Sequence, residues 1–301
     1  MITAPDRSVR EAWGKWLALT RDRCHLHYRL EGQDLTEHID VCLASARDTA
    51  ERIARDVQGI APQPQRVLEI GCSVGFNCLA LALQYPGVTL VGLEPDAEAV
   101  AVGSAMARPD AGRITFVVAT GEGLPFRDGA FDLIVCHTVI EHVADVAAVI
   151  AEMVRVLSPR GAIHLEAPNY LWPREPHLEI WCVPCLGKSA IRLLARLQGK
   201  GRLVAYLDHL QLVTPRRLER LFRRHRLVWE NRARTKLRMI AAGQTGMIKA
   251  YRTLGSVLKI MKGLGVASLI IEAAIALGVY PSVLYTVGRA PASVGRPRSG
   301  A

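Results

Sequence analysis

A glycine-rich turn between an apolar run and a helix constrains the fold of this chain more than any other feature. Segment 66–77 reads Arg-Val-Leu-Glu-Ile-Gly-Cys-Ser-Val-Gly-Phe-Asn. Its apolar part, 67–70, predicts a buried strand, and segment 76–84 after the turn predicts a helix. A second apolar run, 88–93, predicts a neighbouring strand that ends at the acid Glu94. An acid at a strand end beside a glycine turn suits the two hydroxyls of a ribose.

The spacing of the glycines distinguishes between two kinds of nucleotide site. A dinucleotide site needs the pattern G-x-G-x-x-G, and this chain has Ser73 and Phe76 at the second and third glycine positions. The pattern acid-x-G-x-G-x-G fits better, with Glu69, Gly71 and Gly75 in place and Ser73 at the middle glycine. This segment resembles the first motif of the class I S-adenosylmethionine-dependent methyltransferases. The resemblance implies S-adenosyl-L-methionine as the cofactor.

The resemblance extends over about residues 60 to 170. Segments 113–126, 128–143 and 156–169 resemble the family's third, fourth and fifth strands with the turns that line the cofactor. It implies an α/β fold with a doubly wound, seven-stranded, mostly parallel sheet, an N-terminal helical extension and helical insertions. Thr120 stands where the family commonly has an acid that contacts adenine, and its hydroxyl can still accept a hydrogen bond. The cofactor-binding residues that the resemblance implies are Glu69, Gly71, Ser73, Gly75, Asn77, Glu94, Thr120, Gly121, Glu122 and His137.

Capping and turn residues divide the chain into four parts. A capping-box variant at 34–37 predicts a helix that runs toward Gln58. With the segment around Trp13 and Trp16, this helix forms an extension that either covers the pocket, as often in the resembled family, or packs on the sheet edge. We expect this extension over 1–60, the methyltransferase domain over 61–243 and 281–290, a helical insertion over 244–280, and a disordered tail over 291–301.

The later elements are predicted from local signals. Thr214 and Pro215 supply the N-cap and first-turn proline of a helix. Segment 227–240 is interpreted as a sixth strand and its continuation, and segment 281–289 resembles the family's last, antiparallel strand. Residues 170–208 form a long insertion rich in Pro, Trp and His.

The cysteines and the first residues bear on cellular location. Seven scattered cysteines fit reduced thiols rather than a disulfide framework. Cys182 and Cys185, with His177 upstream, supply part of a zinc ligand set, but a tetrahedral site needs four ligands, so we expect no metal. Charged side chains interrupt residues 1–19, so we expect no signal peptide and a cytoplasmic location.

Basic side chains are concentrated in the last third of the chain. Counted along the sequence, residues 187–301 carry 22 of the 38 Lys and Arg but only 4 of the 28 Asp and Glu. The arginines between 216 and 226 are either the solvated face of one helix or part of a positive surface that attracts phosphate-bearing partners.

Segment 247–280 helps to choose among those partners. From Met247 to Lys262, apolar side chains fall on one side of a helix and basic ones on the other. Segment 264–280 is apolar but shorter than the roughly 20 residues needed to span a bilayer, and it contains Glu272. The alternatives are a monotopic contact with an anionic membrane and a buried helical hairpin or dimer surface. We favour the membrane contact.

Methyl transfer to a hydroxyl requires a base beside the methyl donor. By resemblance, His142 lies in a turn that faces the methyl group. Glu141 beside it, His177 in the insertion and His209 just after it are further candidates. His137 is expected to line the cofactor through its backbone.

We therefore interpret the chain as a methyltransferase that methylates an oxygen atom of a small-molecule, lipid-linked or sugar-linked acceptor. We expect it to act in the cytoplasm or peripherally at the inner membrane face. One alternative is an RNA or other nucleic-acid methyltransferase. It is disfavoured because segment 136–142 differs from the Asn/Asp-Pro-Pro-aromatic loop of base-methylating enzymes and the basic third has few aromatic residues. The other alternative is a non-catalytic binding module with this fold, against which the intact Glu69, Gly71, Gly75 and Glu94 argue.

Overall fold

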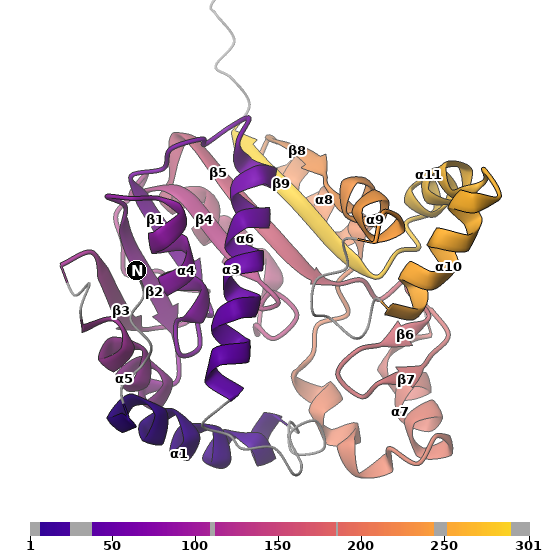
Figure 1. The fold of residues 1–301 in the computed structure, drawn as a ribbon, viewed down its shortest axis with the longest axis horizontal. Coiled ribbons are helices and arrows are strands. Elements are labelled where there is room, and N and C mark those ends of the chain that lie inside the picture. Colours follow the sequence, from indigo (N-terminus) through magenta and orange to yellow (C-terminus); the bar gives the residue numbers. More distant parts are fainter. Residues whose placement is uncertain (1–6, 25–37, 109–111, 185, 244–251, 290–301) are drawn as a thin grey trace, which may run out of the picture.

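The computed structural model describes residues 7–24, 38–108, 112–184, 186–243 and 252–289. Its central sheet contains β1 (Arg66–Ile70), β2 (Thr89–Glu94), β3 (Ile114–Val118), β4 (Phe131–His137), β5 (Leu157–Pro168), β8 (Leu227–Asn231) and β9 (Ser282–Arg289). The strand order is β3-β2-β1-β4-β5-β9-β8 (Figure 1). The first five strands pair in parallel, whereas β9 runs antiparallel to both β5 and β8. The predicted seven-stranded, mostly parallel sheet is confirmed.

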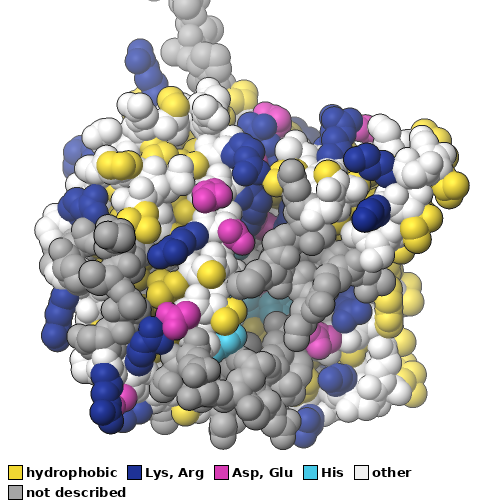
Figure 2. Space-filling view, in the orientation of Figure 1, with side chains coloured by type: hydrophobic (Ala, Val, Ile, Leu, Met, Phe, Trp, Pro, Cys, Tyr) yellow, Lys and Arg dark blue, Asp and Glu magenta, His cyan; other side chains and the backbone are white. Residues whose placement is uncertain are grey.

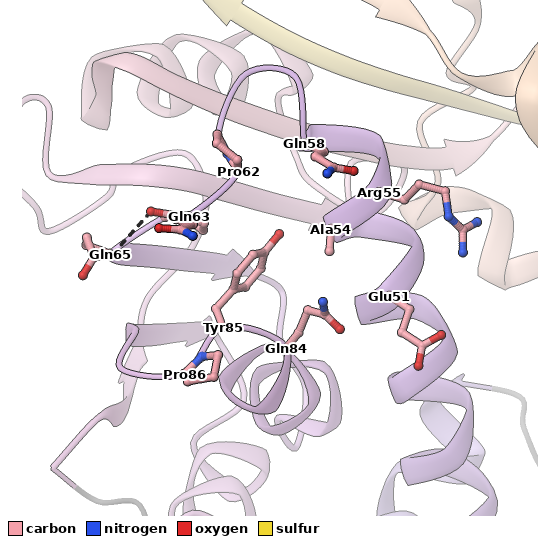
Figure 3. A pocket seen from close by; sticks show the side chains of 11 residues that line it. Glu51, Ala54, Arg55, Gln58, Pro62, Gln63, Gln65, Gln84, Tyr85 and Pro86 are labelled. Carbon is pink, nitrogen blue, oxygen red and sulfur yellow. Dashed lines mark hydrogen bonds between the residues drawn. The ribbon is translucent and has the colours of Figure 1, made fainter.

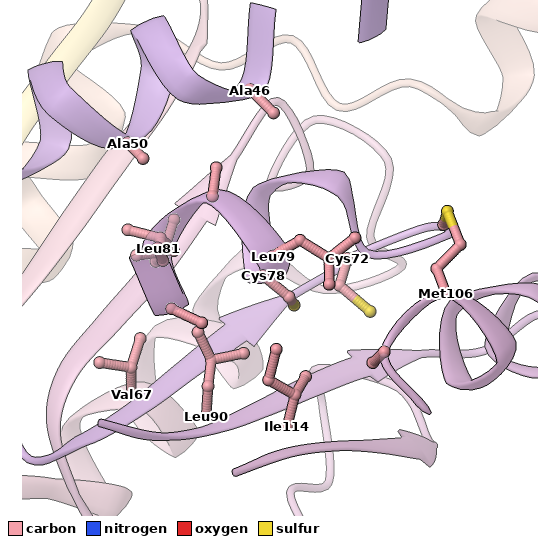
Figure 4. Packing of buried hydrophobic residues seen from close by; sticks show 14 of the residues in the cluster. Ala46, Ala50, Val67, Cys72, Cys78, Leu79, Leu81, Leu90, Met106 and Ile114 are labelled. Carbon is pink, nitrogen blue, oxygen red and sulfur yellow. The ribbon is translucent and has the colours of Figure 1, made fainter. Parts of the chain in front are cut away.

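Helices cover both faces of this sheet. On one face, α3, α4 and α5 pack over the strands in one continuous apolar cluster, which also includes Trp13 and Leu17 of α1 (Figure 4). On the other face, α6 and α8 enclose a second cluster that contains alternate residues of the same strands. The two clusters form because a parallel strand covered on both sides is apolar along its whole length. The helices are α1 (Arg7–Cys24), α3 (His38–Val57), α4 (Phe76–Gln84), α5 (Ala97–Met106), α6 (Val146–Val156), α7 (Gly187–Leu197), α8 (Pro215–Arg224), α9 (Ala233–Ala241), α10 (Arg252–Gly263) and α11 (Ala267–Leu277).

Short polar side chains begin several of these helices. Asp96 and Asp145 accept hydrogen bonds from the first backbone amides of α5 and α6. The predicted cap at Thr214 is confirmed, since its side chain accepts a bond from the amide of Arg217 and Pro215 occupies the first turn of α8. Each cap satisfies amides that have no partner inside the helix.

One aromatic ring fills the space left by three glycines. Phe116 of β3 lies 2.5 Å from the position that a Cβ atom on Gly75 would take, 2.7 Å from that on Gly92 and 3.2 Å from that on Gly103. These glycines come from the turn after β1, from β2 and from α5. The missing side chains allow the turn, the strand and the helix to close around Phe116.

Two insertions extend the sheet domain. The first contains the short strands β6 (Arg174–Glu175) and β7 (Ile180–Trp181), then α7 and the 3-10 helix η2 (Gly201–His209), and it has its own apolar cluster. The second consists of α10 and α11, which pack on α9 through residues that include Leu237, Leu258 and Ile271. Among the helices in the described ranges, none has both the length and the apolar character that crossing a bilayer requires.

The structure corrects one element and leaves three predictions untested. The interpretation of 227–240 as a strand with its continuation is wrong after Asn231, because the chain turns into α9 and buries Ala233, Leu237 and Ile240 at helical spacing. The predicted cap at 34–37, residues 247–251 of the basic segment and the predicted disordered tail over 291–301 lie outside the described residues. Within that segment, the described helix begins at Arg252.

Candidate functional site

The turn after β1 has left-handed backbone at three alternate residues. Gly71, Ser73 and Gly75 have φ angles of 68°, 51° and 81°. Gly71 also lies against Val139, whose Cγ2 atom is 2.4 Å from where a Cβ atom would be. A side chain at either glycine would therefore be both strained and obstructed. The turn leads directly into α4, whose start has no side-chain N-cap, although the amide of Cys78 in its first turn bonds to Glu69.

Glu94 fixes the middle of this turn. Its carboxylate accepts a hydrogen bond of 2.9 Å from the backbone amide of Ser73 and one of 3.2 Å from that of Asp96. Partial burial raises the pKa of Glu94, while these two amides oppose the shift. Each carboxylate oxygen has a second acceptor position, so the group can still bind two hydroxyls. The serine at the middle glycine position is thus part of the turn and not a disruption of it.

Glu69 supports the turn from beneath. It is buried at 2% exposure and accepts hydrogen bonds of 2.9 Å from both the Asn77 amide and the Cys78 thiol. Burial raises the pKa of Glu69 to about 7, although both donors oppose the shift. The two predicted cofactor residues Glu69 and Asn77 therefore contact each other and join β1 to α4.

The segment after β3 lies against the start of α6. Glu122 accepts a hydrogen bond of 2.8 Å from the amide of Ala144 and also bonds to the Thr120 hydroxyl. Burial alone would raise the pKa of Glu122, but the backbone amides and Thr120 lower it overall. Gly121 is buried, and a Cβ atom there would be 3.2 Å from Val149. Glu122 therefore connects the β3 turn to the segment that carries the candidate base His142.

The predicted bases His142 and His177 lie together. Their rings are 5.1 Å apart in an edge-on arrangement, and Tyr206 of η2 lies 5.4 Å from His177. The Nδ1 atom of His177 is 2.7 Å from the buried carboxylate of Glu175. Partial burial and then the neighbouring His177 lower the pKa of His142 to about 4. The third candidate, His209, is exposed at the end of η2 and is not among the described contacts of this cluster.

Glu141 adds a buried acid to this cluster. It is fully buried, and neither carboxylate oxygen has a hydrogen-bond partner among the described residues. Burial raises its pKa to about 7. Nε2 of His142 lies 3.8 Å from one of its carboxylate oxygens. The sequence placed Glu141 among the candidate bases but gave no sign of its burial, and it missed Glu175, because nothing local distinguishes a buried acid from an exposed one.

The side chain of His137 joins a second polar network, behind the strand ends. It lies 3.4 Å from Glu166, which pairs with Arg52 of α3 at 2.5 Å and also with Lys236 of α9. Burial lowers the pKa of His137 to about 4, and the flanking cations hold that of the buried Glu166 well below its usual range. The side chain of His137 is thus engaged with Glu166, and the role of its backbone beside the cofactor stays a prediction.

Two groups of side chains have the composition of a metal site. Glu141, His142 and His177 each offer a ligand atom, and these atoms lie within 4.8 Å of one another. His137, His164 and Glu166 form a similar group, although there the charge of Glu166 is already balanced by Arg52 and Lys236. Cys182 is a free thiol, and Cys185 lies outside the described residues.

Helix α1 lies across the carboxyl edge beside the turn. Trp13 is buried at 1% exposure and contacts the rings of His38 and Phe76. The indole of Trp16 donates a hydrogen bond of 3.0 Å to Asp96. The N-terminal extension is therefore attached to both the start of α4 and the turn after β2.

A separate cleft of about 670 Å³ lies at the opposite edge of the sheet (Figure 3). Its lining residues precede β1 and β2 or belong to the end of α3, and Tyr85 points into it. Because the glycine turn and Glu94 follow the carboxyl ends of the strands, this cleft is not the nucleotide site.

Comparison with known proteins gives the class of the fold and, for residues 68–165, the kind of domain. The structure resembles a geranyl diphosphate methyltransferase in complex with S-adenosylmethionine, with a TM-score of 0.51, 17% identity, and coverage of 81% of this chain and 85% of that one. It also resembles phosphoethanolamine N-methyltransferase 2 of Haemonchus contortus, with a TM-score of 0.50, 15% identity, and coverage of 79% and 52%. These likenesses establish the class I methyltransferase fold.

Sequence comparison finds a methyltransferase domain in the middle of the chain. Residues 68–165 match the family model described as a methyltransferase domain. Norajmaline N-methyltransferase of Rauvolfia serpentina is 36% identical over 155 residues, which cover 50% of this chain and 52% of that protein. Ubiquinone biosynthesis O-methyltransferase of Rhizobium johnstonii is 31% identical over 131 residues, which cover 43% and 52%. The chain spans about half the length of these curated relatives. It carries a class I, S-adenosylmethionine-dependent methyltransferase domain.

Proposed function

We propose that this protein transfers a methyl group from S-adenosyl-L-methionine to a hydroxyl of a small-molecule or lipid-linked acceptor. The observation that carries the proposal is the joint geometry of the glycine turn and Glu94 at adjacent strand ends. The left-handed turn and the uncapped start of α4 provide backbone donors, and Glu94 provides a carboxylate beside them. These groups fit the amino-acid and ribose parts of the cofactor, respectively.

When bound, the cofactor supplies an activated methyl group on a positively charged sulfur. Glu94 would hold the ribose hydroxyls, and the backbone of the turn would allow the cofactor to approach closely. Thr120 and Gly121, which follow β3, would lie on the adenine side, and His137 at the end of β4 would contribute its backbone. The protein's own tasks are thus to orient the donor and to prepare the acceptor.

The acceptor side contains a carboxylate and imidazole pair. A hydroxyl must lose its proton as it attacks the methyl group, so a base is needed. His177 is hydrogen-bonded to the buried Glu175, which stabilises the imidazolium form that proton uptake would produce. His142, with its pKa lowered to about 4, stays neutral near pH 7 and is the weaker base. We therefore assign the base to His177, with His142 as the neighbouring alternative and exposed His209 as the third candidate.

Both N- and O-methyltransferases occur among the relatives. The dyad of His177 and Glu175 favours an oxygen atom as the methyl acceptor in this protein. An amine that reaches the site in its neutral form attacks without prior proton removal, whereas a hydroxyl must lose its proton.

We further propose that the protein is cytoplasmic and attaches peripherally to anionic membranes through 247–280 and the basic last third. A nucleic-acid substrate is disfavoured. Residues 247–251 of that segment lie outside the described residues.

Calorimetric titration tests the cofactor assignment directly. We expect the wild-type protein to bind S-adenosylmethionine and its demethylated product at one site per chain. An absence of binding heat with both, at temperatures chosen to give a nonzero enthalpy, would contradict the proposed function.

A further inference from the structure

Exposed apolar side chains are concentrated on the two insertions. Of the large hydrophobic residues that are exposed in the described ranges, most belong either to β7 and α7 or to the α10–α11 hairpin. In the first insertion they are Trp181, Val183, Leu186, Leu193 and Leu197, and in the second they are Val257, Ile260, Leu264, Val266, Leu269 and Leu277.

Helix α7 has an apolar stripe that the fold does not cover. Its inner face is formed by the buried Ile191 and Ala195, which pack in the cluster of the first insertion. Leu193 and Leu197, four residues apart and 57% and 74% exposed, form a second apolar line on the outside. Leu186, seven residues before Leu193, extends the same line at 58% exposure. An ordinary surface helix has one apolar face, whereas this one has two.

The α10–α11 hairpin has a similar outer surface. Leu258 and Ile271 are buried against α9, while Ile260, Leu264 and Leu269 are 66%, 72% and 72% exposed. Lys259 and Lys262 lie on the same helix and are also exposed. Burial of the inner face therefore does not account for the apolar outer residues.

Both insertions lie at one end of the molecule. In Figure 1 the α10–α11 hairpin and the β7–α7 insertion occupy the right-hand end of the longest axis, and α1 and α5 lie toward the other end. Figure 2 shows apolar side chains along that right-hand outline, with Lys and Arg side chains beside them. One flat surface placed against this end would meet both insertions.

The charge around these residues selects the partner. Residues 187–277 contain only four acids, of which Asp208 pairs with Arg192 and Glu272 pairs with Arg234 and Arg238. Arg196, Lys259 and Lys262 are exposed near the apolar residues. A surface that is apolar at its centre and cationic around it is complementary to anionic lipid, which offers both phosphate and hydrocarbon.

We propose that α7 and the α10–α11 hairpin together form one docking surface for an anionic phospholipid bilayer. Helix α7 is the new element, and it belongs to the insertion that also carries His177 and Tyr206. This arrangement places the membrane next to the acceptor side of the site. The proposal rests on the peripheral attachment proposed above and adds α7 to its surface. Vesicle binding is measured without cofactor, so its failure would leave the methyl-transfer proposal untouched.

Vesicle co-sedimentation of the full chain tests this surface. Vesicles of phosphatidylcholine with phosphatidylglycerol should bind the wild type, and pure phosphatidylcholine should bind it less. The double variant Leu193→Gln/Leu197→Gln should lower the partition coefficient about tenfold or more, since two leucines lose burial. Ile260→Gln/Leu264→Gln should do the same, and the combined variant should abolish binding.

Matched controls separate the other outcomes. Val41→Gln/Leu83→Gln changes two exposed apolar residues on α3 and α4 and should leave binding unchanged. Unchanged binding of the α7 variant would overturn the proposal. So would a wild type that stays in the supernatant but forms a dimer that the same substitutions dissociate, because the surface would then join two copies. Calorimetry with S-adenosylmethionine on each variant reports on the nucleotide site separately.

Discussion

The indole of Trp16 donates a hydrogen bond of 3.0 Å to Asp96, which connects the N-terminal helix to the residue two positions beyond Glu94. Asp96 uses its other carboxylate oxygen to cap α5, and its own amide donates to Glu94. A single turn therefore joins α1, α5 and the acid expected to bind ribose. Helix α1 contributes to the nucleotide site through this turn, in addition to packing on the sheet edge.

Trp16→Phe should weaken cofactor binding while leaving the fold intact. The phenyl ring preserves most of the packing, but the hydrogen bond that steadies the Glu94 turn is lost. We expect a loss of about 0.5–1.5 kcal/mol, or roughly threefold to tenfold in affinity. Calorimetry measures it, with Trp229→Phe as a control that removes an indole N–H elsewhere. Equal affinities for Trp16→Phe and the wild type would show that α1 does not support the site.

Glu94→Gln should reduce cofactor affinity by about 1.5–3 kcal/mol, because charge-assisted bonds to the ribose hydroxyls become neutral. Its amide oxygen can still accept from Ser73, whereas the amide of Asp96 loses its acceptor. Glu94→Ala should cost more, since the amide of Ser73 then loses its acceptor as well. The exposed Glu98→Gln is the control. A Glu94→Gln protein that binds the cofactor as tightly as the wild type would remove Glu94 from the site.

His177→Ala should lower turnover roughly 100-fold with little change in cofactor affinity, because it removes the proton acceptor. Glu175→Gln should give a smaller loss, since a neutral amide does not balance the charge that the ring gains with the proton. His225→Ala, at the end of α8, is the matched control. The same loss in His142→Ala, with His177→Ala still active, would transfer the role of base to His142.

Glu141→Gln should flatten the pH dependence of stability. The pKa of Glu141 is raised from 4.5 to about 7 in the folded protein by burial, so the folded state holds this proton over a range in which the unfolded chain has lost it. Stability from this group is therefore lost as pH rises from about 4.5 to 7. Denaturant unfolding at pH 5, 6, 7 and 8, compared with wild type, measures the effect. A variant whose stability falls across this range as steeply as that of the wild type would show that Glu141 ionises freely in the fold.

Local signals in the sequence were sufficient for the elements that form the nucleotide site. The glycine turn, α4 and the strands on either side were predicted because each is defined by residues close in the chain, such as Gly71, Gly75 and Glu94. Thr214 and Pro215 likewise marked the start of α8. The antiparallel last strand came from family resemblance and is confirmed by the pairing of β9 with β5.

Distant pairings and ambiguous periodicity limited the prediction elsewhere. The contacts of Glu166 with Arg52 and Lys236 span 114 and 70 residues, and no local pattern identifies such partners. In 233–241, branched and basic residues suit either a strand or a helix, and packing against α10 and α11 decides for the helix. The dyad of His177 and Glu175 was half predicted, because a nearby histidine is visible in the sequence but the burial of its acid is not.

The contact of Phe116 with three glycines makes those positions evolutionarily interdependent. A methyl group at Gly92 would lie 2.7 Å from the ring but also 2.8 Å from the Cys72 thiol, and one at Gly103 would lie 3.2 Å from the ring but 3.1 Å from the carbonyl oxygen of Val74. A smaller residue at position 116 therefore relieves only part of the crowding at these two glycines. Gly75 is restricted further, because its φ angle of 81° disfavours any side chain. Homologous chains with a small residue at position 116 should therefore keep glycine at 75, and should show alanine at 92 or 103 only where the contacts with residues 72 and 74 have also changed.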